Sequence, residues 1–125
     1  MDARKKIMFV DDEEGFLKMV KLNLEGKGEY EVLTVTNGNE AVKAACLFRP
    51  DMIFLDVIMP EVDGGAVLAE LEATPELKHI PVVFLTAILT QVEINAQGGK
   101  HVSGRDFLAK PVTTAKLIEY IKKYL

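Results

Sequence analysis

The chain has 125 residues, of which 49% are hydrophobic and 27% charged, and its formal net charge is −4. This length and balance fit one globular domain over 1–125, and the negative charge argues against general binding to nucleic acid or to a membrane surface, because both need a basic face. The charged N-terminus precedes an apolar run too short for a signal peptide, and no stretch approaches the ~20 apolar residues that cross a bilayer, so we expect a cytoplasmic location.

Short apolar runs alternate with longer amphipathic stretches in the first half of the chain. These patterns predict, in order, a strand at 7–10, a helix at 16–24, a strand at 31–35 and a helix at 41–48. Gly26 and Gly28 should end the first helix, and Asn37-Gly38-Asn39 should form the turn before the second. Cys46 is the only cysteine and lies in an apolar helical stretch, so we expect it to pack in the core.

The alternation continues in the second half, with predicted strands at 52–55, 81–85 and 107–109 and a helix at 66–72. Thr113 or Thr114 can cap a last helix that carries Leu117, Ile118, Ile121 and Leu125. Before the last strand, 89–96 has a weak apolar face and 97–104 contains three glycines. Because glycine costs ~1 kcal/mol relative to alanine inside a helix, we expect a short or frayed fourth helix and a mobile loop there.

The order of these elements is strand then helix, five times over. Near-continuous apolar strands indicate a sheet that is buried on both faces, and the alternation with helices indicates parallel strands with right-handed crossovers. The sequence therefore predicts an α/β fold, a doubly wound five-stranded parallel sheet with helices on both faces. Ligands bind such folds at the carboxyl ends of the strands.

Side chains that can take part in metal binding or catalysis lie at four of these strand ends. Asp11 and Asp12 follow the first strand, Asp56 the third, Thr86 ends the fourth, and Lys110 follows the fifth. Three carboxylates in one crevice repel each other unless a cation lies among them, and oxygen ligands favour a hard ion such as Mg²⁺. With a lysine and a hydroxyl donor nearby, these are the parts that phosphoryl transfer needs. Asp56 is the best candidate for the nucleophile, because it stands alone on the middle strand, facing the acidic pair.

Each of these residues also has an ordinary structural explanation. The acidic run 11–14 could favour a helix N-terminus, and Asp56 could simply end a strand in a turn. Thr86 could cap the next helix, and Lys110 could be a solvated surface residue. Their coincidence at four strand ends favours a common site over these separate explanations.

Four motifs, in order along nearly the whole chain, resemble the CheY-like receiver domain of two-component response regulators. They are Asp11-Asp12, the stretch Leu55-Asp56-Val57-Ile58-Met59-Pro60-Glu61-Val62-Asp63-Gly64, Thr86-Ala87 and Lys110-Pro111. The resemblance implies a flavodoxin/CheY-like fold with strand order 2-1-3-4-5 and a single receiver domain over 1–125. It also implies a signalling domain that promotes its own phosphorylation and dephosphorylation, and not an enzyme in the usual sense.

The resemblance further implies a role for each matching residue. Asp56 would accept a phosphoryl group from the phosphohistidine of a sensor histidine kinase or a phosphotransfer protein. Mg²⁺ would be held by Asp11, Asp12, Asp56 and the main-chain carbonyl of Ile58, and Thr86 and Lys110 would contact the phosphoryl group.

Phe107 matches the switch aromatic of the family. Thr86 and Phe107 would move on phosphorylation and reshape the surface of the fourth helix, fifth strand and fifth helix. Ile58 and Ile88 take the places that flank the attacking water. Neither can orient it, so we expect slow self-dephosphorylation.

Two other functions compete with a phosphoacceptor domain. An aspartate-nucleophile phosphatase usually has a second Asp two residues after the nucleophile, where this chain has Ile58. A receiver-like or flavodoxin-like binding module without phosphotransfer is the other, but no glycine-rich phosphate loop follows the first strand. The sequence leaves open the cognate kinase, the downstream effector and whether the chain forms a homodimer.

Overall fold

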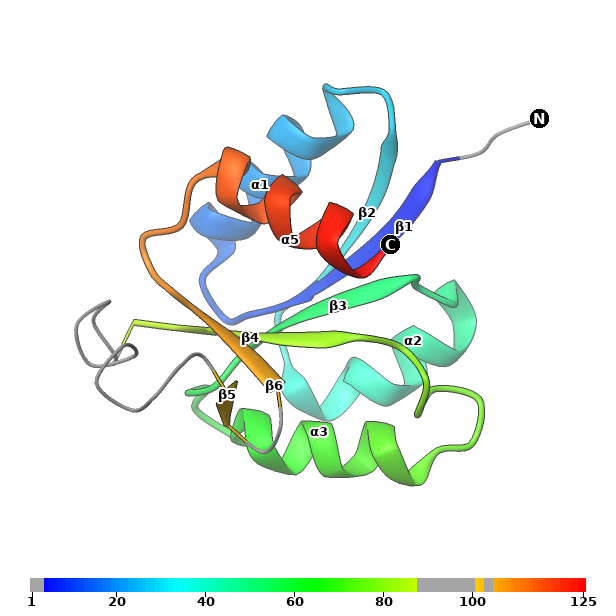
Figure 1. Ribbon diagram of the computed structural model, residues 1–125. Helices are drawn as coiled ribbons and strands as arrows, with labels where there is room; N and C mark the ends of the chain where they lie inside the picture. Colours follow the sequence, from blue (N-terminus) through cyan, green and yellow to red (C-terminus); the bar gives the residue numbers. More distant parts are fainter. Residues whose placement is uncertain (1–3, 88–100, 103–104) are drawn as a thin grey trace.

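A computed structural model of the chain describes residues 4–87, 101–102 and 105–125. Figure 1 shows a twisted sheet with α1 and α5 on one face and α2 and α3 on the other. In chain order, the elements are β1 (Lys5–Val10), α1 (Glu14–Glu25), β2 (Tyr30–Val35), the short 3-10 helix η1 (Gly38–Glu40), α2 (Ala41–Phe48), β3 (Met52–Asp56), α3 (Gly64–Ala73), β4 (Val82–Thr86), β5 (His101–Val102), β6 (Arg105–Ala109) and α5 (Thr114–Tyr124).

The sheet has the order β2-β1-β3-β4-β6-β5. The strands β2, β1, β3, β4 and β6 are all parallel. Because β6 is the fifth of the predicted strands, the predicted order 2-1-3-4-5 is confirmed. The sequence did not predict β5, a two-residue strand that pairs antiparallel with Arg105 and Asp106 of β6 at the edge of the sheet.

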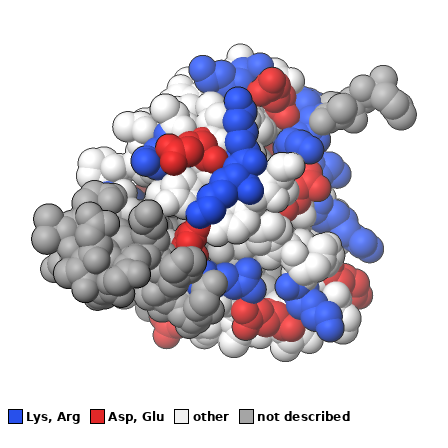
Figure 2. All heavy atoms as spheres, in the orientation of Figure 1, with Lys and Arg blue, Asp and Glu red and all other residues white. Residues whose placement is uncertain are grey.

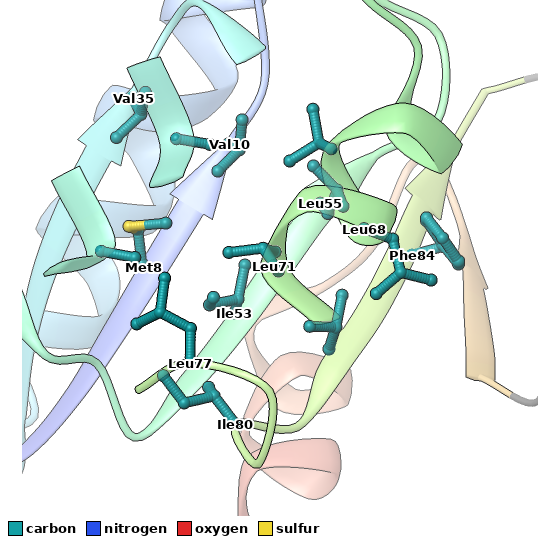
Figure 3. Close-up of a cluster of buried hydrophobic side chains, with 14 of the residues drawn as sticks. Met8, Val10, Val35, Ile53, Leu55, Leu68, Leu71, Leu77, Ile80 and Phe84 are labelled. Carbon is teal, nitrogen blue, oxygen red and sulfur yellow. The ribbon is translucent and has the colours of Figure 1, made fainter. Parts of the chain in front are cut away.

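Two hydrophobic cores lie on the two faces of the sheet, because successive side chains of a strand point to opposite sides. Ile7 and Phe9 of β1 pack in the core under α1 and α5, whereas Met8 and Val10 pack in the core under α2 and α3. Figure 3 shows this second core, in which Leu71 of α3 lies against the strand residues. Burial on both faces explains why the strands appear as continuous apolar runs.

The helix ends are formed largely by the residues that the sequence indicated. Gly28 adopts a φ of +81° just after α1, a conformation that favours glycine. The Asn37 side chain accepts a hydrogen bond from the Asn39 amide and so caps η1. Of the two candidate caps for the last helix, Thr113 is the one whose side chain accepts a hydrogen bond, from the Lys116 amide.

One expectation about the core was wrong. Cys46 is exposed, because Ala41 and Ala45 face the sheet and the residue after Ala45 lies about 100° further around α2. Leu125 is 43% exposed, since α5 ends at Tyr124 and its buried face ends with Ile121.

The sequence did not predict one buried polar group. Asp106 of β6 is 1% exposed, and its Oδ2 accepts hydrogen bonds from Tyr124 Oη at 2.5 Å and Lys123 Nζ at 2.8 Å. The last turn of α5 is thereby tied to the sheet by a charged and a neutral hydrogen bond.

The predicted fourth helix at 89–96, most of the loop 97–104 and Ile88 lie outside the described residues. Among the residues that are described, no helix is both long enough and apolar enough to cross a bilayer. On the face shown in Figure 2, basic and acidic side chains are interspersed, as on an ordinary solvated surface.

Candidate phosphoryl-acceptor site

The fold gathers the predicted strand-end residues at one edge of the sheet. Asp11 directly follows β1, Asp56 ends β3, Thr86 ends β4, and Lys110 directly follows β6. Because these strands are parallel neighbours in the order β1-β3-β4-β6, their carboxyl ends meet.

Three carboxylates form the centre of the site. Asp11, Asp12 and Asp56 each offer one carboxylate oxygen, and these atoms all lie within 4.8 Å of one another. Asp11 is 0% exposed and Asp56 5% exposed, whereas Asp12 lies at the surface. The cluster is therefore buried at its base and open at its rim.

Local backbone contacts hold the two buried carboxylates in place. Asp11 Oδ1 accepts a hydrogen bond from the Glu13 amide at 2.9 Å, and Asp56 Oδ1 accepts a longer one from the Ile58 amide at 3.4 Å. A Cβ atom at Gly64 would lie 2.5 Å from the Asp56 carbonyl oxygen. Only glycine lets α3 begin this close to the end of β3.

Lys110 is the cation of the site. Its Nζ lies 2.5 Å from Asp11 Oδ2, 2.6 Å from Glu13 Oε1 and 3.9 Å from Asp56 Oδ2. The same atom stands 4.8 Å from the centroid of the Phe16 ring, a cation–π contact. One ammonium thus faces three carboxylates, and it lies nearer to Asp11 and Glu13 than to Asp56.

The electrostatic cost of this arrangement falls on Asp56. Burial, and then the negative charge of Asp11, raise the pKa of Asp56 to about 7, while Lys110 and the Ile58 amide act in the opposite direction. Burial alone would lower the pKa of Lys110, but its hydrogen bonds to Asp11 and Glu13 raise it. The lysine is therefore a fixed positive charge, and Asp56 is a carboxyl group whose ionisation the site resists.

The remaining predicted residues lie around this centre in different ways. Thr86 is 2% exposed, and its carbonyl accepts a hydrogen bond from the Lys110 amide at 2.8 Å. Phe107 is buried in the core under α3, where its ring packs edge-on against Phe84 with a centroid distance of 5.3 Å. The Ile58 side chain points outward and is 53% exposed.

Glu13 is a site residue that the sequence did not single out. It stands in the acidic run 11–14, for which helix capping was an open explanation, but its side chain makes no capping hydrogen bond to α1. It pairs instead with Lys110, almost a hundred positions away in the chain. Four consecutive acidic residues were visible in the sequence, but the member that meets the lysine was not.

Comparison with known proteins agrees with the resemblance that the four motifs indicated. Residues 7–122 match the family model described as the response regulator receiver domain. The polar-differentiation response regulator DivK of Brucella anthropi is 37% identical over 123 residues, which cover 97% of this chain and 96% of that protein. DivK of Brucella ovis is 36% identical over the same length.

Solved structures show the same fold. Chemotaxis protein CheY4 of Vibrio cholerae superposes with a TM-score of 0.82 at 31% identity, over 98% of this chain and 100% of that one. The receiver domain of sensor histidine kinase PA1611 from Pseudomonas aeruginosa superposes with a TM-score of 0.80 at 29% identity, over 98% of both chains. That domain has a magnesium ion coordinated in its active-site cleft. The three-carboxylate cluster of the present chain is typical of such a site.

Proposed function

Because this chain belongs to the response regulator receiver family, we propose that Asp56 is its phosphoacceptor and receives the phosphoryl group of a phosphohistidine. The chain is a phosphoacceptor signalling domain of two-component systems and not a classical enzyme. The observation that carries the assignment is the convergence of Asp56 with two other carboxylates and Lys110 at the carboxyl ends of β1, β3 and β6.

The transfer forms one bond and breaks another. An Asp56 carboxylate oxygen forms a new bond to phosphorus while the N–P bond of the donor histidine breaks, and the electron pair of that bond stays on the histidine nitrogen. Asp56 must be ionised to attack. A pKa of about 7 leaves Asp56 only partly ionised near neutral pH in the metal-free site, and added positive charge would favour the ionised form.

Mg²⁺ fits the donor set. Asp11, Asp12 and Asp56 supply carboxylate oxygens within 4.8 Å of one another, and we assign the main-chain carbonyl of Ile58 as the fourth protein ligand. When bound, the ion offsets the negative charge of the carboxylates and of the phosphoryl oxygens. The donors are all oxygens, which favours a hard cation over zinc or copper.

Lys110 and Thr86 complete the proposed machinery. The Lys110 ammonium is already 3.9 Å from Asp56, close enough to pair with a phosphoryl oxygen after a small movement. Thr86 ends the neighbouring strand, and its hydroxyl is the proposed donor to a second oxygen. We assign Thr86 and Phe107 as the switch pair, and Ile58 and Ile88 as the residues that slow dephosphorylation, because neither isoleucine can orient a water.

The partners that follow from the family are a sensor histidine kinase or a phosphotransfer protein as the phosphoryl donor, and a downstream effector. We include a single domain over 1–125, a cytoplasmic location and a possible homodimer in the proposal. The first of these is supported by the family match over 7–122. Neither a phosphatase nor a flavodoxin-like cofactor binder accounts for that match.

The test is phosphorylation by a small donor. With Mg²⁺ and acetyl phosphate, the intact mass should rise by one phosphoryl group, and Asp56→Asn should abolish the gain. Asp51→Asn is the matched control, because Asp51 lies at the opposite end of β3, where its side chain accepts a hydrogen bond from the Lys6 amide. Equal labelling of Asp56→Asn and the parent would show that the nucleophile is another residue.

A further inference from the structure

The loop from β3 to α3, residues 57–63, carries the proposed carbonyl ligand Ile58, and the structure fixes both ends of this loop. The Val57 amide donates to the Leu85 carbonyl at 3.0 Å, and the Val57 carbonyl accepts from the Gly64 amide at 2.7 Å. At the other end, Asp63 Oδ1 accepts from the Ala66 amide at 2.8 Å and caps α3.

Ile58 itself is poorly anchored between these ends. Its side chain is 53% exposed, and among the residues that the structure describes its amide bonds to Asp56 alone, at a long 3.4 Å. The carbonyl of Ile58 belongs to the same planar peptide group as the nitrogen of Met59. Any side-chain contact that fixes Met59 therefore also limits the direction of the Ile58 carbonyl.

Met59 is buried beside the turn after β2. It is 7% exposed, and its Cε lies close to Gly38, where a Cβ atom would stand 3.1 Å from it. The same Cβ would stand 2.5 Å from Val62 Cγ1 and 3.1 Å from Val67 Cγ2. The φ of Gly38 is not in the left-handed region, so glycine is required there for space and not for backbone conformation.

A polar contact joins the same turn to the same loop. Asn37 Nδ2 donates to Glu61 Oε1 at 3.0 Å, while Asn37 Oδ1 is held by the Asn39 amide at 2.8 Å. Beside these contacts lies a hollow of about 250 Å³, bordered by Asn37, Met59 and Glu61 among others. The loop is incompletely packed on that side, so the contacts with Asn37 and Gly38 carry more of its support.

We propose that the Asn37–Gly38 turn is a positioning element for the metal site. It holds Met59 and Glu61 and thereby fixes the peptide group whose carbonyl is the proposed ligand from Ile58. Asn37 and Gly38 border the same hollow as Asp12, and they act on the site through Met59 and Glu61. The inference rests on the proposed function, because it assumes that the site binds Mg²⁺.

The first experiment is a Mg²⁺ titration by calorimetry on Gly38→Ala, Val62→Ala and the double variant. Gly38→Ala should push Val62 and Met59 away and weaken Mg²⁺ binding about tenfold, as is usual when support behind a ligand is lost. Adding Val62→Ala removes the 2.5 Å clash and should restore most of the affinity. Gly15→Ala is the glycine control, because no atom of the described part of the chain lies within 4 Å of its Cβ position, and it should bind like the parent.

Two further readouts separate positioning from a general loss of structure. Urea unfolding in EDTA reports the stability of each variant without metal. Labelling by acetyl phosphate should be slow in Gly38→Ala at limiting Mg²⁺ and should approach the parental rate at saturating Mg²⁺, because the carboxylates and Lys110 are unchanged.

Glu61 provides a test that does not depend on the folding of Gly38→Ala. Glu61→Gln removes the charge but keeps an oxygen for Asn37, whereas Glu61→Ala removes the contact as well. We expect weaker Mg²⁺ binding by Glu61→Ala than by Glu61→Gln. Equal affinities of these two variants, or a parental affinity of folded Gly38→Ala, would overturn the inference. A parent that neither binds Mg²⁺ nor is labelled would instead overturn the proposed function.

Discussion

Asp56→Asn should stabilise the metal-free protein, and the gain should depend on pH. Asparagine is close in shape to the protonated carboxyl group and cannot ionise. In the folded chain the pKa of Asp56 is about 7, against an ordinary value of 3.8, because the residue is buried beside Asp11. Ionisation of Asp56 therefore costs the folded state free energy that it does not cost the unfolded chain.

The sign follows from proton binding. Between pH ~4 and ~7, the folded state holds a proton on Asp56 that the unfolded state has lost, so the free energy of unfolding falls as pH rises. Below pH ~4 both states are protonated and the stability is retained in full; above pH ~7 both are ionised and the loss is complete. The difference between the two pKa values corresponds to at most about 4 kcal/mol, and relaxation of the site will reduce it.

The measurement is urea unfolding in EDTA, followed by circular dichroism from pH 4.5 to 8.5. The free energy of unfolding of Asp56→Asn should exceed that of the parent by little at pH 4.5 and by about 2–4 kcal/mol at pH 8. Asp51→Asn, at the other end of the strand, should show no such rise. Adding Mg²⁺ should stabilise the parent more than the variant and narrow the gap. A gap that stays constant across this pH range would refute the assignment of an ionisation cost to Asp56.

Four other predictions can be tested with the same material. Asp12→Ala should bind Mg²⁺ at least about tenfold more weakly and be no less stable in EDTA, which calorimetry and urea unfolding would check; lower stability would favour a helix-capping role. Ile58→Asn combined with Ile88→Glu should release phosphate faster than the parent, because both new side chains can orient a water, and equal release rates would count against that role. Glu25→Gln should lose up to about 1 kcal/mol of stability at pH 7 and progressively less as the pH is lowered into the acid range. The hydrogen bond from the Val32 amide lowers the pKa of Glu25, so its contribution is lost as pH falls through that pKa, and unfolding across this pH range decides. Tyr124→Phe should lower the free energy of unfolding by about 1–3 kcal/mol, because it removes the 2.5 Å hydrogen bond that Tyr124 donates to buried Asp106. The control is Tyr30→Phe, because no side-chain bond from Tyr30 to a buried carboxylate is seen in the described part of the chain.

Local pattern in the sequence was enough to predict a doubly wound parallel sheet, whereas the strand order came from the resemblance to receiver domains. Runs such as Met52–Leu55 are apolar at every position, which requires burial on both faces of a sheet, and four of the runs are followed by the helices α1, α2, α3 and α5, each with one face in a core. These features depend on residues close together in the chain. The carboxyl end of each strand was visible for the same reason, and so the amino-acid sequence alone was enough to assign Asp11, Asp56, Thr86 and Lys110 to one crevice.

Contacts between distant segments were decided only by the tertiary structure. The sequence could not show that Glu13 and not Glu14 meets Lys110, that Asp106 is buried under Tyr124, or that Gly38 leaves room for Val62. It also placed Cys46 in the core, although helical periodicity alone cannot say which side of an almost wholly apolar helix faces the sheet. In each case the partner lies elsewhere in the chain, and its position is set by the twist and packing of the whole sheet, which no local spacing of residues encodes.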